Sequence, residues 1–165
     1  QVADGAILNW LAPEDVPKCV AVVREAARAA GRDPASIEIS ARLFVFVDPP
    51  TPESDQAARR HMAAYLNVPV YRAFHEWLGR SETLGPMWEA WGKGDRKGAV
   101  AAIPDRVIGE ILQRGSMAEI RARVQRYFDA GLDTAFLSLT TVEPDPERKR
   151  AVLRDAVLAL APGAR

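Results

Sequence analysis

Residues Pro104–Thr140 read PDRVIGEILQRGSMAEIRARVQRYFDAGLDTAFLSLT, which is an amphipathic helical segment followed at once by an apolar strand. Ser116 and Glu119 have the spacing of a capping box. In that motif the serine oxygen accepts from the N–H three residues later, and the glutamate accepts from the serine N–H. Gly131 can adopt the left-handed conformation that ends a helix. A helix, a glycine stop and a strand are half of a βαβ unit, so this stretch indicates a parallel sheet.

The helix after Ser116 is expected to have one apolar face. Four residues recur at helical spacing along it: Ile120, Val124, Tyr127 and Phe128. This face is predicted to pack against the sheet.

Three strands are predicted, at Gly5–Asn9, Ile37–Val47 and Asp133–Thr140. In the second, small and branched apolar residues alternate with residues that are polar at its start and aromatic at its end. A strand that becomes apolar on both sides is typical of a parallel sheet covered by helices. Helices are expected between and after the strands, at about Pro13–Ala30, Glu53–Leu66, Ser116–Ala130 and Glu147–Leu160. The predicted fold class is α/β, with parallel neighbouring strands and helices on the outside.

A helical insertion is predicted at about residues 68–102. Two sets of aromatic residues in it have helical spacing: Tyr71, Phe74 and Trp77, then Trp88 and Trp91. Long connections in compact domains are usually functional or disordered. We expect the insertion to be a mobile cover over the strand ends, with a subunit interface or plain core packing as the alternatives.

The composition argues against several classes of function. The 22 basic and 22 acidic residues cancel, and the sequence has no basic stripe, so nucleic-acid binding is not expected. The sequence has neither a signal-peptide pattern nor an apolar run that would span a bilayer, so we expect a cytoplasmic protein without a membrane partner. Cys19 is the single cysteine and is expected to be a small buried hydrophobe.

The chain has 165 residues, about one domain's worth. Three strands do not close a barrel, which needs eight strands and about 250 residues. The first residues lack an initiator methionine and lead directly into a strand. We therefore expect residues 1–165 to be a single domain that forms the C-terminal part of a larger α/β domain.

Three segments, in order, resemble the luciferase-like monooxygenase superfamily, most closely its branch that uses the deazaflavin F420. Residues 3–11, ADGAILNWL, resemble the family's A-D-G-x-I-x-N-W segment. Val107–Gly109 followed by Gly115–Glu119 resembles its late G-[ST]-x-x-E helix start, and residues 130–134, AGLDT, resemble its A-G-[VL]-D segment. The resemblance implies the C-terminal part of a (β/α)8 TIM barrel with a helical insertion, and a missing N-terminal half as its partner.

The resemblance also implies an activity. The expected protein is an oxidoreductase that transfers hydride between F420 and a small organic substrate, with FMN and monooxygenation as the alternative. We expect the intact protein to be a homodimer, and this chain alone to be inactive because the missing half would supply much of the flavin pocket. A hypothesis from a different class is a non-catalytic α/β interaction module, derived from such a barrel, that buries its open edges in a partner.

Cofactor-binding residues are expected near the C-terminal ends of the strands, where barrel enzymes place their sites. Asn9 is expected to hydrogen-bond a ring carbonyl and Trp10 to wall the pocket, and the family motif adds Asp4 and Gly5. The alternative roles are structural: a loop cap at Asn9, packing at Trp10, and close backbone approach at Gly5.

Substrate-binding residues are expected on the later strands, at Phe44, Phe46 and Thr140. Barrel filling is the alternative role of the two phenylalanines. Arg42 shares a strand face with Phe44 and, if buried, needs an anion, either an internal carboxylate or a ligand phosphate.

Other chemistry has no motif in this sequence. His61 and His75 have no ligand-spaced companion, so we expect solvated or hydrogen-bonded histidines and no metal site. G-x-G-x-x-G, Walker and G-x-S-x-G motifs are absent, which removes the support for nicotinamide, nucleotide and triad-hydrolase functions. The catalytic residues remain unassigned, as expected where a cofactor carries the chemistry.

Overall fold

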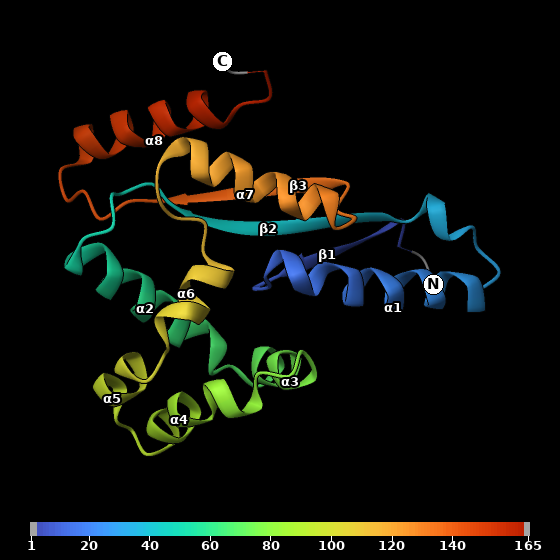
Figure 1. Ribbon diagram of the computed structural model, residues 1–165, viewed down its shortest axis with the longest axis horizontal. Coiled ribbons are helices and arrows are strands. Elements are labelled where there is room, and N and C mark those ends of the chain that lie inside the picture. Colours follow the sequence, from blue (N-terminus) through green and yellow to red (C-terminus); the bar gives the residue numbers. More distant parts are fainter. Residues whose placement is uncertain (1–2, 164–165) are drawn as a thin grey trace.

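The computed structural model describes residues 3–163 as an α/β domain (Figure 1). One parallel sheet has the strand order β1-β2-β3, with β1 at Gly5–Asn9, β2 at Glu38–Phe46 and β3 at Thr134–Thr140. The predicted parallel, neighbouring strands are confirmed. β2 is one residue shorter at each end than expected, since Ile37 caps a preceding 3-10 turn and the chain turns away after Val47.

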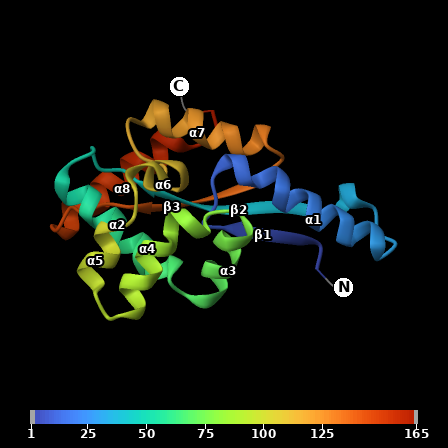
Figure 2. The ribbon, with the colours of Figure 1, turned by 60° about the horizontal axis from the view of Figure 1, so that its bottom comes forward.

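Three of the helices run along the sheet, and another five form a group that packs beside the ends of the strands (Figures 1 and 2). The first set is α1 (Val16–Ala29), α7 (Met117–Asp129) and α8 (Pro146–Leu160). The second set is α2 (Pro52–Leu66), α3 (Pro69–Trp77), α4 (Ser81–Gly92), α5 (Arg96–Ala101) and α6 (Asp105–Ile111). Short 3-10 turns at Pro13–Asp15 and Pro34–Ser36 flank α1. Within residues 3–163, no helix combines the length and apolar character needed to cross a membrane.

Side-chain alternation gives the sheet two different faces. On the outer face, Ile39, Ala41 and Leu43 are buried against α1 and α7. Val45 continues this face into a cluster with α7 and α8. Helices therefore cover the outer face, as predicted. We call the opposite face the inner face; its residues include Ile7 and Asn9 of β1, Ser40, Arg42, Phe44 and Phe46 of β2, and Phe136, Ser138 and Thr140 of β3.

The predicted capping box begins α7. The amide of Glu119 donates to Ser116 Oγ over 3.3 Å, and the amide of Ser116 donates to Glu119 Oε2 over 2.8 Å. Gly131 ends the helix with φ 109°, a conformation that glycine adopts without a steric penalty.

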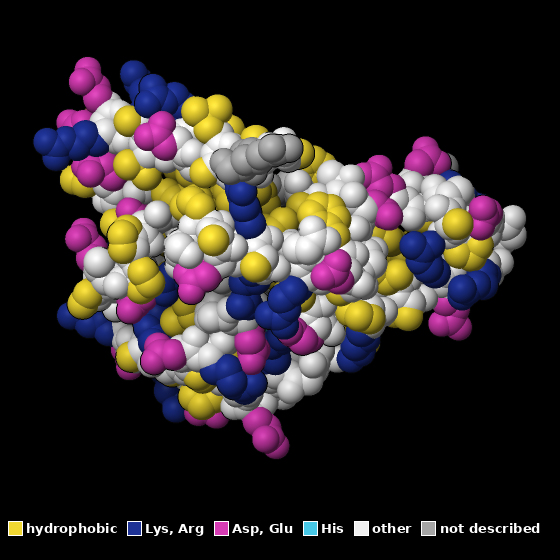
Figure 3. Space-filling view, turned by 45° about the horizontal axis from the view of Figure 1, so that its top comes forward, with side chains coloured by type: hydrophobic (Ala, Val, Ile, Leu, Met, Phe, Trp, Pro, Cys, Tyr) yellow, Lys and Arg dark blue, Asp and Glu magenta, His cyan; other side chains and the backbone are white. Residues whose placement is uncertain are grey.

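The predicted apolar face of α7 is correct at three of its four positions. Ile120 and Tyr127 are fully buried, and Val124 packs against the same clusters. Phe128 is 37% exposed and lines a surface groove with Leu137 of β3 and Leu160 of α8, so it lies at the border between the sheet and α8. Figure 3 shows hydrophobic side chains exposed on this side of the molecule, with acidic and basic side chains interspersed around them.

A second strand-like contact lies beside β2, at Gln113. Its amide donates to the Phe44 carbonyl and its carbonyl accepts from the Phe46 amide, each over 2.9 Å. β1 pairs with β2 only as far as Arg42, so Gln113 extends the ladder on the same edge after β1 has ended. The Gln113 side chain donates to Tyr127 Oη, and that hydroxyl donates to the Leu11 carbonyl. One buried network thus joins the end of β1, the segment after α6, and α7.

The predicted insertion consists of α3, α4 and α5, which pack with α2 and α6 in one apolar cluster that also includes Trp10, Phe44 and Phe46. Trp88 is 6% exposed and donates to the Leu66 carbonyl over 2.8 Å. Trp91 is partly buried against the same cluster. For Trp88 the structure therefore shows the core-packing alternative, and the mobility of the insertion stays a prediction.

Candidate functional site

The C-terminal ends of β1 and β2 bring polar and aromatic side chains together on the inner face. In the strand register Asn9 lies opposite Arg42, and Arg42 lies opposite Phe136. α2 crosses this end of the sheet and adds a histidine and a tyrosine. We call six residues the inner-face cluster: Asn9, Trp10, Arg42, Phe44, His61 and Tyr65.

The aromatic members of the inner-face cluster form a packed wall. The rings of Trp10 and Phe44 are stacked with centroids 4.1 Å apart and an interplanar angle of 25°. Tyr65 lies 4.9 Å from the Trp10 ring, and His61 meets Phe44 edge-on at 5.3 Å. The guanidinium carbon of Arg42 lies 4.7 Å from the Phe44 centroid. Such ring pairs restrict one another's rotamers, so the wall is a fixed surface.

Trp10 has an unusual backbone conformation. Its φ is +56°, and within residues 3–163 no other residue except glycine has a positive φ. A bulky side chain in this region is strained, and such strain persists only where the surroundings hold it. Trp10 is 1% exposed and packs against both Phe44 and Tyr65. Strain of this kind is concentrated at ligand-binding sites, which favours a functional role for this corner.

Several buried polar atoms in the inner-face cluster have no hydrogen-bond partner within the described residues. They are Asn9 Oδ1, Trp10 Nε1, Arg42 Nε and His61 Nε2. The Asn9 amide nitrogen, by contrast, donates to Tyr71 Oη over 3.2 Å. Buried polar groups are nearly always paired, so these four atoms call for partners outside the described residues. A ligand, water and the rest of the barrel are the three sources of such partners.

The two histidines are buried to different extents. Burial, and secondarily the charge of Arg42, lowers the pKa of His61, so its imidazole is neutral at pH 7. His75 is fully buried and neither of its ring nitrogens has a hydrogen-bond partner. Burial and the nearby Arg80 lower the pKa of His75 to about 4. His75 therefore departs from the expectation of a solvated or hydrogen-bonded histidine, because α3 buries its ring. His61 is partly exposed and only its Nε2 is buried without a partner, so for His61 the expectation stays a prediction. Cys19 is buried as expected, and burial raises its pKa to about 11.

The structure does not bring all the predicted cofactor residues together. Asn9 and Trp10 lie in the inner-face cluster. Asp4 and Gly5 lie at the opposite end of β1, about 13 Å away at the rise of a strand. Asp4 is exposed and pairs with Arg32 over 2.9 Å. A Cβ on Gly5 would lie 2.9 Å from the Glu38 carbonyl oxygen, so close backbone approach explains this glycine.

The predicted substrate residues lie near one another on the inner face. Phe44 is part of the wall, and Phe46 is 5.9 Å from the His61 ring. Thr140 is opposite Phe46 in the register, and its carbonyl accepts from the Val47 amide. Both phenylalanines are buried under α2, while Thr140 is partly exposed on the neighbouring strand.

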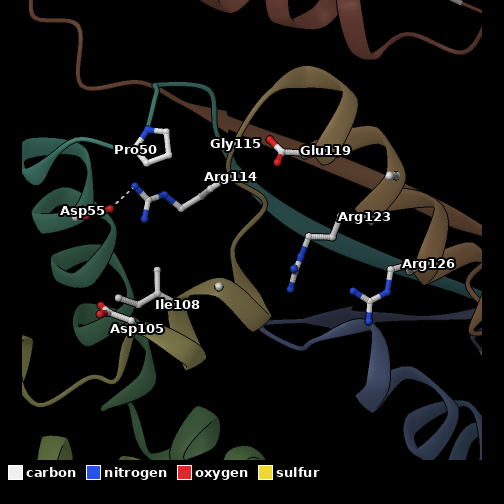
Figure 4. Close-up of a pocket in the computed structure, with 11 residues that line it drawn as sticks. Pro50, Asp55, Asp105, Ile108, Arg114, Gly115, Glu119, Arg123 and Arg126 are labelled. Carbon is white, nitrogen blue, oxygen red and sulfur yellow. Dashed lines mark ion pairs between the residues drawn. The ribbon is translucent and has the colours of Figure 1, made fainter.

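A separate hollow of about 710 Å³ lies between the start of α2, α6 and α7 (Figure 4). Three arginines and three acidic residues line it, so their charges balance: Arg114, Arg123, Arg126, Asp55, Asp105 and Glu119. Arg114 already pairs with Asp55 over 2.5 Å. No group of three or more metal-ligating side chains occurs in the described part of the chain. The inner-face cluster is therefore the better candidate for a site.

Sequence reasoning missed His61 and Tyr65 as members of the cluster. Both lie on α2, four residues apart, which places them on one helical face. That spacing was available in the sequence. Which strand ends this face covers was not, since it depends on how α2 turns back over the sheet.

Comparison with known proteins places the fold. The chain is similar to the coenzyme F420-dependent tetrahydromethanopterin reductase of Methanopyrus kandleri, with 22% identity and a TM-score of 0.66 over 94% of this chain and 44% of that one. It is also similar to an F420-dependent secondary alcohol dehydrogenase solved with an F420–acetone adduct, with 17% identity and a TM-score of 0.62 over 96% of this chain and 43% of that one. The chain thus spans less than half of the length of these structures.

The similarity to these two structures concerns the fold, and it confirms the predicted class, part of a (β/α)8 TIM barrel. A family model described as luciferase-like monooxygenase matches residues 1–134. The chain belongs to the luciferase-like monooxygenase family.

Proposed function

We propose that this chain is part of an F420-dependent oxidoreductase that transfers hydride between the deazaflavin and a small organic substrate. The observation that carries the proposal is the inner-face cluster, where orphaned polar atoms and a flat aromatic wall meet at the ends of the strands. Enzymes with this barrel place their sites at that end. The similar solved structures are F420-dependent enzymes by their names, which favours F420 over FMN.

The cluster fits a ring cofactor. A deazaflavin has flat apolar faces and polar edges. The inner-face cluster contains aromatic rings that match the faces and hydrogen-bonding atoms that match the edges. The stacked rings of Trp10 and Phe44 form a buried apolar layer under α2, and Trp10 Nε1 and Asn9 Oδ1 are an unpaired donor and an unpaired acceptor. Bound F420 would supply the hydride chemistry. The residues of this chain would orient the ring and exclude water, which is the protein's usual share of such catalysis.

We further propose that the remaining strands of the barrel cover the inner face. Ile7 is 72% exposed and Phe136 is 51% exposed, although both lie on the same face as the buried Phe44. Apolar side chains on a barrel interior are normally packed in layers. The N-terminal half of the barrel is the partner that this face fits, and a homodimer of the complete barrel remains our expectation for the assembly.

The test is F420 binding to the protein in which this chain is joined to the rest of its barrel, measured by fluorescence titration. Asn9→Ala and Trp10→Phe should each weaken F420 binding about tenfold, since each removes one polar contact. Asn67→Ala, which removes a side chain at the end of α2, is the matched control and should leave the affinity unchanged. Failure of the unmodified protein to bind either F420 or FMN would overturn the proposal.

The exposed inner face also favours a second candidate, a non-catalytic interaction module. Ile7 and Phe136 form an apolar surface that a protein partner would bury. A purified protein that has a stable partner and never shows F420 or FMN absorbance would support this candidate instead.

A further inference from the structure

Arg42 is an arginine without a carboxylate partner in residues 3–163. Its Nε is shielded from solvent and makes no hydrogen bond. The Nε atoms of Arg114 and Arg123 are buried without a partner too, but those two guanidiniums bind through another nitrogen: Arg114 pairs with Asp55 over 2.5 Å, and Arg123 donates to the Glu110 carbonyl over 2.6 Å. For Arg42 the described residues provide no such second contact. An N–H group that has lost water without gaining a partner is costly, and a guanidinium gains most from an anion that accepts from it.

The nearest acidic residue on the same strand face does not fill this role. Glu38 is four residues before Arg42, which is about 13 Å along a strand. Glu38 is exposed, and its carboxylate accepts from Ser40 Oγ over 3.2 Å. The other inner-face neighbours of Arg42 in the register, Asn9 and Phe136, are uncharged.

The position of the Arg42 guanidinium is restricted. It lies over the Phe44 ring, which is itself stacked on Trp10. A planar guanidinium held by an aromatic ring presents its N–H groups as a fork that matches the two oxygens of a carboxylate or a phosphate. The charge also acts on its surroundings, because Arg42 is the second cause, after burial, of the lowered pKa of His61.

We propose that Arg42 binds an anionic group of the substrate, a carboxylate or a phosphate, at the inner-face cluster. This inference rests on the proposed function and narrows it to acidic substrates. Asn9 faces Arg42 in the register, so the anion lies beside the residue that we assign to the cofactor. The substrate's charged end is thereby fixed next to the ring.

The experiment is an NMR titration of the His61 imidazole with inorganic phosphate and, separately, with acetate, against sodium chloride at equal ionic strength. An anion at Arg42 offsets the guanidinium charge, so the pKa of His61 should rise. Arg42→Gln should raise this pKa without any anion and abolish the response. Arg42→Lys should retain it, and Arg28→Gln, which removes an exposed arginine on α1, should respond like the unmodified protein.

An equal response in Arg42→Gln, or no response in the unmodified protein, would overturn the proposal. A second titration is made with the protein saturated with F420, which itself carries phosphate and carboxylate groups. If the anion still raises the pKa of His61 when F420 is bound, the result supports a substrate site at Arg42. If bound F420 abolishes this rise, Arg42 binds an anionic group of the cofactor, and the proposal is overturned. If the protein binds F420 but neither phosphate nor acetate changes the pKa of His61, the role of Arg42 is refuted and the proposed function stands. If the anions raise the pKa of His61 but the protein binds no cofactor, the proposed function is refuted. The anion at Arg42 then cannot be assigned to an oxidoreductase substrate.

Discussion

The hydroxyl of Tyr127 connects three parts of the chain that are distant in sequence. It accepts from the Gln113 side chain over 3.0 Å and donates to the Leu11 carbonyl over 2.8 Å. The ring is fully buried, and burial raises the pKa of the phenol, which stays protonated. Such a hydroxyl fixes the relative positions of β1, the Gln113 segment and α7.

Tyr127→Phe should lower the free energy of unfolding by about 1–3 kcal/mol, because it leaves a buried amide and a buried carbonyl short of a partner. Tyr65→Phe is the matched control, since within the described residues the Tyr65 hydroxyl has no hydrogen bond, and should change stability by less than about 0.5 kcal/mol. Urea unfolding of the two variants measures the difference. Equal stabilities would show that the Tyr127 hydroxyl adds nothing to the network.

His75 should make stability depend on pH. Its pKa is about 4 in the folded chain and about 6.5 in the unfolded chain, so the unfolded state binds the proton more readily. The stabilising effect is complete above pH 6.5 and is lost as the pH falls from about 6.5 to about 4, by up to about 3 kcal/mol. His75→Leu should flatten this part of the curve of unfolding free energy against pH. Phe74→Leu is the control, because it alters the neighbouring ring without removing a titrating group. If Phe74→Leu flattens the curve as much as His75→Leu does, the pH dependence does not come from His75.

At the scale of single residues, part of the site was predictable. Asn9, Trp10 and Phe44 follow from their places at strand ends, which sequence alternation locates. The orphaned state of Arg42 and His61 was not predictable, because it depends on which side chains fail to reach them. Asp4 and Gly5 were grouped with Asn9 by a motif, although a strand holds its two ends far apart.

The capping box of α7 is the element-scale feature with the clearest energetic consequence. Ser116→Ala should destabilise the protein by about 1 kcal/mol, since the Glu119 amide loses its acceptor. Ser81→Ala, an exposed serine at the start of α4 with no hydrogen bond of its own in the described chain, is the control and should have little effect. Thermal unfolding measures both. Hydrogen bonds from Ser116 lower the pKa of Glu119, so the loss should shrink as the pH falls through the folded pKa of that carboxyl.

Gly5 should resist substitution because β1 and β2 approach closely there. A Cβ would lie 2.9 Å from the Glu38 carbonyl oxygen and 3.3 Å from its Cβ, so Gly5→Ala should cost about 1–3 kcal/mol through overpacking. Gly109→Ala is the opposite case, since nothing lies within 4 Å of that position in α6, and should stabilise by up to about 1 kcal/mol. Denaturant unfolding compares the two. Similar effects of both substitutions would argue against a steric role for Gly5.

Most elements were predictable because their signals are local. Strand alternation, the S-x-x-E box and Gly131 gave bounds within a residue or two for β1, β2, β3 and α7. The exposure of Phe128 was not predictable, because a helical face at that position borders both the sheet and α8. The Gln113 ladder contact was also missed, since a single bridging residue leaves no periodic pattern in the sequence.

For the whole molecule, we expect this chain alone to show no F420 or FMN turnover. Only three strands are present in the described residues, and Ile7 and Phe136 remain exposed on the face that a closed barrel would enclose. Joining the chain to the rest of the barrel should produce turnover and raise the midpoint of thermal unfolding. The assay follows the loss of cofactor absorbance with a preparation whose mass proves its content. Turnover by residues 1–165 alone would refute the expectation.

The pairing of Val45 with Gln113 has a consequence for how the molecule tolerates change in length. The chain between Val45 and Gln113 contains all of α2–α6, and the pairing brings its two ends together. The α2–α6 group is therefore anchored at both ends to β2. Loop-closure entropy rises slowly with length, by about 0.6 kcal/mol for each doubling. Turns between α3, α4 and α5 could therefore lengthen or shorten in evolution while the ladder keeps its register. The segment best suited to vary in length between relatives is thus the one that packs beside the inner-face cluster.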